Sequence, residues 1–584
     1  MSRQLSPSFG IARSSGRRYR VCHKRRLSRA VPREGVVGQS HLGGAHLAGA
    51  HLGKADRFGA RLRGVALVAA LLLAPLGAAG QAAEERPPAN DANTLLPVTA
   101  SPTGSPGDSE IKARLAGTGP LSVAGEPLHA ALLRRFYAGH DNQPVWATHP
   151  AQATALWHAV LNAGDQGLDP ESFHVSAFAK TALSPIDRDL LLSDAFLGYA
   201  EALARGVVPP ELRTEDEDLS PDQIDAVAAV DATLTAPNPE AALRALAPAT
   251  PEYAALRRGY ETYQAIVKAG GWPVLPANPP AHLLQQRLAI EGFLPAGYAS
   301  NVFDEQTLQA LKKFQERHGL EADGKLGATT LVELNVPAEM RTRQIAVNLE
   351  RQRWLPRKIP GDRLWVNTAN AQLELFRDGQ PIFTTRVVVG ETDKQTPEFE
   401  ASVVSVLYNP PWYIPYGIAQ KEIMPLVEAD PGYLAKHHMT MRENGSILQE
   451  AGPYSALGRL KFEMPNKFDV YLHDTPLRSY FALANRRLSH GCVRVQNPRQ
   501  LASLLMGIPE QDISKAIDTG VTNRHMLPQA IPVFVVYQTA FADPGGGVDF
   551  RRDVYQRDND VAQHLVHAPQ PPLAARGVGN QRGG

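Results

Sequence analysis

The chain has 584 residues, of which 43% are hydrophobic, so it is long enough to form two to four domains that each bury a core. Its 60 basic residues balance its 59 acidic residues almost completely, and this balance gives no indication of a nucleic-acid partner. Only two cysteines occur, Cys22 and Cys492.

The first 83 residues are expected to be a basic leader and a secretory signal peptide. Residues 1–63 carry fourteen Lys or Arg and only two Asp or Glu, a bias that by itself would also suit a nucleic-acid-binding arm. An apolar core follows from Val65 to Leu76, and small residues continue through Ala83. This order is typical of an export signal, and the core is shorter than the roughly 20 apolar residues of a membrane span. We therefore predict export with cleavage of the signal, with an uncleaved inner-membrane anchor as the alternative.

Two segments of different composition follow the predicted signal. Residues 84–125 are rich in Pro, Ser, Gly and Asp and lack apolar periodicity, which predicts a disordered tether. In residues 126–275, apolar side chains recur at three-to-four spacing between Pro and Gly turns. This second segment is therefore predicted to be a helical scaffold domain without a catalytic cluster.

Residues 280–336 predict three short helices around a small core. The second helix begins at Asp304 and carries Leu308, Leu311 and Phe314 on one face. The order LQQRL, FDEQT, ALKKFQ, HGL and DGK resembles the peptidoglycan-binding domain of bacterial cell-wall enzymes. A helical spacer that binds nothing is the alternative interpretation.

The pattern changes to strands after a predicted connecting helix at residues 337–361. The stretch RLWVNTANAQLELFRDGQPIFTTRVVVG alternates apolar and polar residues and turns at Asp378-Gly379, a hairpin signal. Further strands are expected at ASVVSVLYN, KFDVYLHD and IPVFVVYQTA. Residues 362–541 are therefore predicted to form a β-rich, sandwich-like domain, and the chain as a whole an α+β multidomain protein.

Two irregular segments complete the expected domain organisation. Residues 412–466 are rich in Pro, Gly and Met and are predicted to cap the sheet as a lid. Residues 542–584 are rich in Gly, Arg and Pro and are predicted to be a disordered tail.

Cys492 lies in the stretch RRLSHGCVRV and would be the single thiol left after Cys22 departs with the leader. A thiol becomes a useful nucleophile when a neighbouring base takes its proton, and histidine is the usual base. His490 is two residues away, whereas His473 ends a predicted strand and could face the thiol across a loop. Gly491 would let backbone N–H groups approach an oxyanion, and Arg494 would offer a cation to a substrate carboxylate. These parts indicate acyl transfer through a thioester.

The spacing H-x15-S-H-G-C-V-R resembles the signature of the L,D-transpeptidase catalytic domain of the YkuD type. The stretches VVVGETDKQTPEF, YNPPWYIP and KFEMPNKFDVYLHDTP are similar to the same family, in its large periplasmic branch. That branch joins a helical scaffold, a peptidoglycan-binding unit and a capped catalytic domain. The resemblance covers residues 127–541 and implies a periplasmic location.

The resemblance implies a catalytic role for each residue of the motif. Cys492 would be the nucleophile, and His473 the general base, oriented by a backbone carbonyl such as that of Asp474. Many relatives have glycine at the Asp474 position, so the resemblance assigns no role to its side chain. His490 and Gly491 would shape the oxyanion hole together with the Cys492 N–H.

The remaining site residues are expected to hold the turn or the substrate. Ser489 would support the turn, and Arg494 would contact the donor peptide. Tyr408, Trp412 and Tyr413 would line the groove, although aromatic residues beside prolines are also found packed within lids.

The resemblance implies that the protein transfers tetrapeptide stems of peptidoglycan to a diaminopimelate amine and so forms 3→3 cross-links. Attachment of a lipoprotein lysine and L,D-carboxypeptidase activity would use the same acyl-enzyme. No cofactor is implied, and a synthase or carboxypeptidase that supplies tetrapeptides is a possible partner class. Two other interpretations are a wall-binding protein without catalysis and a zinc site built from His473, His490 and Cys492.

Overall fold

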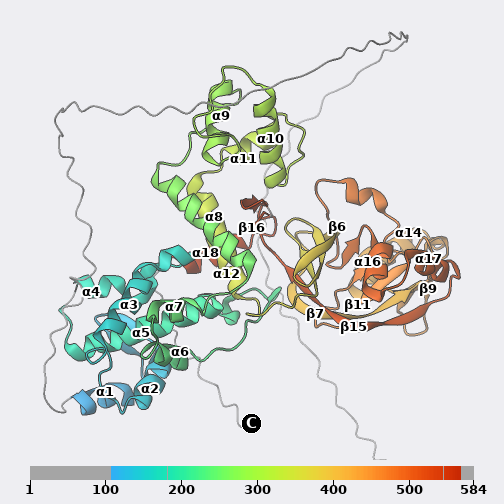
Figure 1. The fold of residues 1–584 in the computed structure, drawn as a ribbon. Coiled ribbons are helices and arrows are strands. Elements are labelled where there is room, and N and C mark those ends of the chain that lie inside the picture. The colour runs from blue at the N-terminus through green and yellow to red at the C-terminus, as the bar shows by residue number, and fades with distance from the viewer. Residues whose placement is uncertain (1–106, 181, 544, 567–584) are drawn as a thin grey trace, which may run out of the picture. The chain divides into compact units, whose positions relative to one another are not determined.

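The computed structural model describes residues 107–180, 182–543 and 545–566 (Figure 1). The predicted leader and signal at 1–83, residues 84–106 of the predicted tether and residues 567–584 of the predicted tail lie outside the described residues. Among the residues that are described, no helix has both the length and the apolar character needed to cross a membrane. The described chain is an α+β multidomain protein, as the sequence predicted.

The scaffold part is helical and is organised around one long buried helix, α5 (Pro185–Arg205). Ser184 caps this helix by accepting a hydrogen bond from the Asp187 N–H, and Pro185 occupies the first turn, where its missing N–H costs nothing. The other helices of this part include α2 (Ala130–Gly139), α3 (Pro150–Leu161), α4 (Val175–Lys180), α6 (Ala226–Thr233), α7 (Pro239–Arg244) and α8 (Pro251–Lys268).

The predicted disordered tether at 84–125 differs from the structure over its second half. Helix α1 (Gly107–Ala116) and the hairpin of β1 (Leu121–Val123) and β2 (Glu126–Leu128) lie there. Ile111, Leu115 and Val123 are buried in the scaffold core. The apolar residues of this stretch are too irregularly spaced to show periodicity, yet these three each fill a place in the core.

The three helices predicted within 280–336 are present as α9 (Ala281–Ile290), α10 (Glu305–Arg317) and α11 (Ala328–Leu334) (Figure 1). Asp304 caps α10 by accepting a hydrogen bond of 2.9 Å from the Thr307 N–H. The helices enclose a core of their own, which contains Leu284, Leu288, Leu311, Phe314 and Leu334.

Helix α12 (Ala338–Arg353) is buried on nearly all sides rather than on one apolar face. Its charged side chains are paired inside the protein, since Arg353 meets Glu350 at 3.2 Å and Arg351 meets Asp558. A buried charge is tolerated only when it is paired, so these ion pairs are what permits complete burial. They also explain how a helix with so many charged residues can be buried.

The β-rich part is one large sheet that closes on itself (Figure 1). The strand order is β11-β12-β14-β6-β5-β4-β15-β7-β3, and β7 also pairs with β11. The strands are β3 (Glu217–Asp218), β4 (Arg363–Asn367), β5 (Gln372–Arg377), β6 (Gln380–Gly390), β7 (Glu398–Tyr408), β11 (Leu460–Glu463), β12 (Leu472–His473), β13 (Arg487–Ser489), β14 (Val493–Val495) and β15 (Asn523–Val536).

The hairpin between β5 and β6 turns at the predicted dipeptide. Asp378 has φ 49° and Gly379 has φ 77°, the left-handed pair that a two-residue hairpin turn requires. Helices α16 (Pro498–Met506) and α17 (Glu510–Asp518) bury Leu501, Leu505 and Ile513 in the same core as the strands.

The predicted cap at 412–466 is a small unit with its own three-stranded sheet, in the order β8-β10-β9. Its elements are β8 (Trp412–Tyr413), α13 (Tyr416–Ile418), a π-helical turn (Ala419–Ile423), α14 (Met424–Ala429), α15 (Tyr433–Lys436), β9 (Met439–Met441) and β10 (Ile447–Gln449). Ile414, Ile423 and Ile447 belong to its separate core. The cap ends earlier than predicted, because residues 460–463 form β11 of the main sheet.

The predicted disordered tail at 542–584 is wrong for its described part. The chain forms a hairpin of β16 (Ala540–Ala542) and β17 (Val548–Phe550) and then α18 (Asp558–Leu565). Val548, Phe550, Val561 and Leu565 are buried in the same core as the scaffold helices. Charged residues are frequent in this stretch, but Val548 and Phe550 on β17 and Val561 and Leu565 on α18 supply the apolar surface that packs it against the core.

Candidate active site

Cys492 lies on a tight turn between β13 and β14. Gly491 has φ +107°, a left-handed conformation that disfavours any residue with a Cβ. The Ser489 hydroxyl donates a hydrogen bond of 2.6 Å to the Cys492 carbonyl and accepts one of 3.3 Å from the Gly491 N–H. Ser489 therefore closes the turn in the way that its predicted supporting role requires.

We call residues 489–492 the nucleophile turn, after the role that the resemblance implies for Cys492, and His473 lies on the strand next to it. Strand β12 runs parallel to β14 with His473 opposite Arg494, and the Val493 N–H donates to the Tyr471 carbonyl at 3.1 Å. The His473 ring is buried, and its Nδ1 lies 2.6 Å from the Asp474 carbonyl oxygen. Because a carbonyl oxygen only accepts, Nδ1 carries the proton, and in the neutral ring Nε2 is the nitrogen that can take another.

The Asp474 side chain, which the resemblance left without a role, is used for structure. Its carboxylate accepts hydrogen bonds from the Arg459 N–H at 2.8 Å and the Thr475 N–H at 2.7 Å, and it pairs with Arg478 at 2.6 Å. These contacts fix the peptide group whose carbonyl orients the His473 ring. A glycine could not form them.

The surroundings of the site favour neutral forms of both reacting groups. Burial, together with the cations of Arg494 and Lys461, lowers the pKa of His473 to about 3. Burial raises the pKa of the Cys492 thiol, although a hydrogen bond from Tyr471 and the same two cations oppose this rise. At neutral pH the two side chains are therefore a thiol and a neutral imidazole.

Tyr471 is a site residue that the sequence analysis missed. Its hydroxyl is hydrogen-bonded to the Cys492 sulfur and to Trp412, and the Lys461 Nζ lies 4.0 Å from its ring centroid. Tyr471 and His473 are two residues apart in an alternating stretch and so share one face of the strand. That alternation in VYLHD was the signal that could have identified Tyr471.

Arg494 carries buried donors without an acceptor. Within the described chain, no group accepts a hydrogen bond from its Nε or Nη1. Its guanidinium carbon lies 5.9 Å from the Tyr480 ring centroid, and burial lowers its pKa. Buried donors without partners are costly, so a substrate carboxylate at this place would relieve that cost.

Arg494→Ala is expected to lower kcat/KM for a donor with a free terminal carboxylate by about 10- to 100-fold, as the loss of a charge-assisted hydrogen bond would. A donor whose terminal carboxylate is amidated should lose a similar factor with the unmodified protein. Steady-state kinetics of the unmodified protein and of Arg494→Ala, each with the free and the amidated donor, tests whether Arg494 binds the terminal carboxylate. If it does, the two losses in kcat/KM should not add. Arg499→Ala removes one exposed cation from α16 and serves as the control for net charge. Additive losses would contradict the assignment.

The cap is joined to the nucleophile turn by Glu422. Its Oε1 lies 2.7 Å from the His490 Nε2 and 2.9 Å from the Lys394 Nζ. The His490 ring therefore contacts the cap, and what remains for the predicted oxyanion role is the backbone of this residue. We name Glu422, His490 and Lys394 the cap latch.

Glu422→Gln is expected to increase hydrogen exchange in residues 416–436 by about 2- to 5-fold, because partly exposed ion pairs contribute up to roughly 1 kcal/mol. Exchange measured by mass spectrometry checks this, with Glu428→Gln as the control on an exposed carboxylate of α14. Equal exchange in both variants would show that the cap is held by its apolar contacts alone.

Tyr408 does not line the groove as predicted. It is 2% exposed, and its hydroxyl lies 3.2 Å from the Met506 sulfur, inside the core of the sheet. Trp412 is half-buried beside Tyr471, whereas Tyr413 is 62% exposed on the cap. Tyr408 ends β7 of the main sheet and is buried in its core, whereas Trp412 and Tyr413 form β8 in the separate sheet of the cap.

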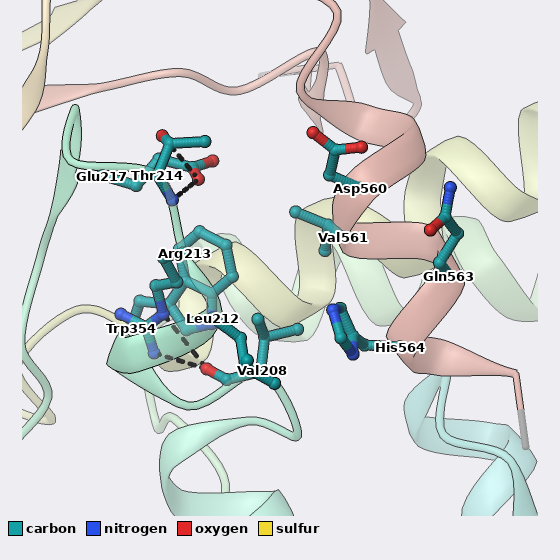
Figure 2. A pocket seen from close by; sticks show the side chains of 10 residues that line it. All are labelled: Val208, Leu212, Arg213, Thr214, Glu217, Trp354, Asp560, Val561, Gln563 and His564. Carbon is teal, nitrogen blue, oxygen red and sulfur yellow. Dashed lines mark hydrogen bonds between the residues drawn. The ribbon is translucent and has the colours of Figure 1, made fainter. Parts of the chain in front are cut away.

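The zinc site was one alternative interpretation of the sequence, and a cavity elsewhere in the protein is a second place to look for a binding site. In residues 107–566, apart from the undescribed positions, no three His, Cys, Asp or Glu side chains are grouped to hold a metal ion. A cavity of about 200 Å³ is lined by segment 208–217, Trp354 and α18 (Figure 2), and it contains none of the predicted site residues.

Three segments of the chain match known protein families. Residues 131–259 match the scaffold domain, residues 278–334 match a domain described as "Putative peptidoglycan binding domain", and residues 361–522 match the L,D-transpeptidase catalytic domain of the YkuD family. The chain carries an L,D-transpeptidase domain. The family resemblance drawn from the sequence is thereby confirmed, with the three domains in the expected order.

A curated bacterial protein is similar to part of the chain. A Haemophilus influenzae protein described as "Putative L,D-transpeptidase" is 34% identical over 242 residues, which are 38% of this chain and 49% of that protein. The chain thus spans about half the length of the curated relative that it matches.

Solved structures of L,D-transpeptidases are also similar to part of the chain. The structure from Xylanimonas cellulosilytica is 16% identical, with 45% of this chain and 97% of that chain covered and a TM-score of 0.18. The structure from Stackebrandtia nassauensis is 17% identical, with 43% of this chain and 88% of that chain covered and a TM-score of 0.17. The structure from Mycobacterium smegmatis is 11% identical, with 30% of this chain and 58% of that chain covered and a TM-score of 0.18.

Proposed function

We propose that this protein is an exported, periplasmic L,D-transpeptidase that remodels peptidoglycan through an acyl-enzyme on Cys492. The observation that carries the proposal is the pairing of β12 with β14, which puts an oriented, neutral imidazole on the strand beside the nucleophile turn. The match to the L,D-transpeptidase catalytic domain supports the same chemistry.

Acylation begins with the neutral thiol. His473 Nε2 takes the proton from the Cys492 sulfur as the sulfur attacks the carbonyl at the L-centre of diaminopimelate in a tetrapeptide stem. The C–N bond to the terminal D-Ala breaks, and the protonated imidazole gives its proton to the leaving amine. Arg494 holds the D-Ala carboxylate, and the Tyr471 hydroxyl stabilises negative charge on the sulfur.

Deacylation reverses these roles. The side-chain amine of a second diaminopimelate attacks the thioester and loses a proton to His473 Nε2. The sulfur leaves and takes that proton back, and the product is a 3→3 cross-link. Water or a lipoprotein lysine in place of this amine would give a tripeptide or an attached lipoprotein, because the acceptor alone decides how the thioester is resolved.

The proposal is tested by mass spectrometry of the purified protein incubated with a disaccharide-tetrapeptide. We expect free D-Ala, an adduct on Cys492 and a cross-linked dimer. Accumulation of disaccharide-tripeptide would instead show that water, and not the diaminopimelate amine, is the acceptor. Absence of both D-Ala release and the adduct would overturn the proposed function and leave a wall-binding role.

A further inference from the structure

The nucleophile turn is held from behind by a buried threonine. The Thr396 hydroxyl donates a hydrogen bond of 2.9 Å to the Gly491 carbonyl and accepts one of 2.9 Å from the Gly390 N–H. Thr396 has no exposed surface. One hydroxyl therefore connects the end of β6 to the peptide group that precedes Cys492.

The contact fixes the direction of a catalytically important N–H. In a trans peptide, the carbonyl of Gly491 and the N–H of Cys492 belong to one plane and point in opposite directions. Among the described residues, no acceptor takes the Cys492 N–H. The bond from Thr396 to the carbonyl therefore aims this free N–H away from Thr396, to where an oxyanion can use it.

The loop that carries Thr396 has little room to move. A Cβ placed on Gly390 would lie 2.1 Å from the Lys394 carbonyl oxygen and 2.7 Å from the Thr396 nitrogen. The loop thus folds back directly over Gly390, which must be a glycine for this approach. The Glu391 N–H also donates to the Ser489 carbonyl at 2.9 Å, so the loop and the nucleophile turn contact each other twice.

The C-terminal segment braces this loop. The Tyr555 hydroxyl donates to the Gly390 carbonyl at 2.7 Å and is also hydrogen-bonded to Thr396. Arg557 meets Gln395 of the loop at 2.9 Å and Glu398, the first residue of β7, at 3.1 Å. Tyr555 and Arg557 lie beyond residues 361–522, where the match to the L,D-transpeptidase catalytic domain ends.

The brace is itself rigid. Tyr555 is 5% exposed, and its ring stacks on Tyr537 with a centroid distance of 5.1 Å and an interplanar angle of 21°. The Tyr537 hydroxyl accepts a hydrogen bond of 3.0 Å from the Tyr555 N–H and donates one of 2.8 Å to Asp553. The position of the Tyr555 hydroxyl is therefore set by packing rather than by a flexible side chain.

We infer that Thr396 and Tyr555 are positioning residues that aim the Cys492 N–H at the developing oxyanion, and that residues 551–557 are a functional part of the active site. This inference rests on the proposed acyl transfer. Neither residue touches the substrate or the sulfur, so each acts only through the direction of the Gly491–Cys492 peptide group.

The test separates reactions that need an oxyanion from one that does not. Release of D-Ala passes through an oxyanion, whereas alkylation of the thiol by iodoacetamide does not. Thr396→Val is expected to lower kcat for D-Ala release by about 10- to 100-fold with little change in KM, since loss of an oxyanion donor costs about 10²- to 10³-fold and misdirection of one costs less. Tyr555→Phe should lower kcat by about 3- to 10-fold, as loss of one buried hydrogen bond would.

The controls distinguish positioning from general destabilisation. Alkylation rates of both variants should stay within about 2-fold of the unmodified protein, and Thr396→Ser, which keeps the hydroxyl, should recover most of kcat. Tyr137→Phe removes a buried, hydrogen-bonded hydroxyl from the scaffold and should leave kcat unchanged.

Each outcome has a distinct meaning. Equal losses of D-Ala release and alkylation, or a kcat unchanged in Thr396→Val, would overturn the inference while the proposed function stands. If the unmodified protein is alkylated but releases no D-Ala, the proposed function itself fails.

Discussion

Cys492→Ala is expected to lower the rate of D-Ala release from a disaccharide-tetrapeptide by about 10⁴-fold or more, because removal of a nucleophile eliminates the covalent route altogether. Cys492→Ser should be nearly as inactive. Its hydroxyl has a much higher pKa than the thiol, and the same burial that raises the pKa of Cys492 would raise it further. Single-turnover assays with mass spectrometry of the protein would measure both rates and the lost adduct.

Cys492→Ala should lose the release of D-Ala but keep its folded structure and its binding of peptidoglycan. Cys492 is half-buried, so truncation to alanine removes one sulfur atom and is expected to cost no more than about 1 to 2 kcal/mol of stability. Binding of insoluble peptidoglycan through residues 278–334 should persist in Cys492→Ala, and a sedimentation assay checks it. A variant that still released D-Ala at a comparable rate would show that another group carries the acyl chain.

Short-range patterns predicted the parts of this fold in which local chemistry decides the conformation. The turn at Asp378-Gly379 needs two left-handed residues, and the Asp304 cap needs only its own helix. The spacing of fifteen residues between His473 and Ser489 led to the prediction that His473 and Cys492 react together, although only the pairing of β12 with β14 explains how the chain returns after them. In each case one or two residues with an unusual backbone or side-chain property carried the signal.

The contacts that tune the site could not be predicted, because they join polar residues far apart in irregular segments. Glu422 meets His490 across 68 positions, and Thr396 meets Gly491 across 95. Tyr555 reaches Gly390 across 165 positions from a stretch whose composition suggested disorder. The sequence shows no periodicity at such residues, because each makes a single long-range hydrogen bond and does not belong to the repeating apolar face of a helix or strand.

His473→Gln is expected to lower kcat/KM at neutral pH by about 10²- to 10⁴-fold, the usual contribution of a general base, and to change the shape of its pH dependence. In the unmodified protein the base must be neutral. Because burial lowers the pKa of His473 to about 3, the base stays neutral down to that pH. Activity should therefore change little between about pH 8 and pH 5 and fall only as the pH drops toward the pKa of His473.

The variant has no base, so its residual rate depends on the fraction of Cys492 that is already a thiolate. That fraction rises about tenfold for each pH unit below the thiol pKa, which burial holds above its ordinary value. The rate of His473→Gln should therefore climb with pH across the range in which the unmodified protein is flat, and kcat/KM from pH 5 to pH 9 would show it. His318→Gln is the matched control, because His318 is also a buried imidazole whose pKa burial holds well below its usual value, in the peptidoglycan-binding unit. A steep acid limb near pH 6 to 7 in the unmodified protein would contradict this prediction, because either the His473 base would then titrate near the ordinary histidine pKa of about 6.5 or a preformed thiolate would be protonated there.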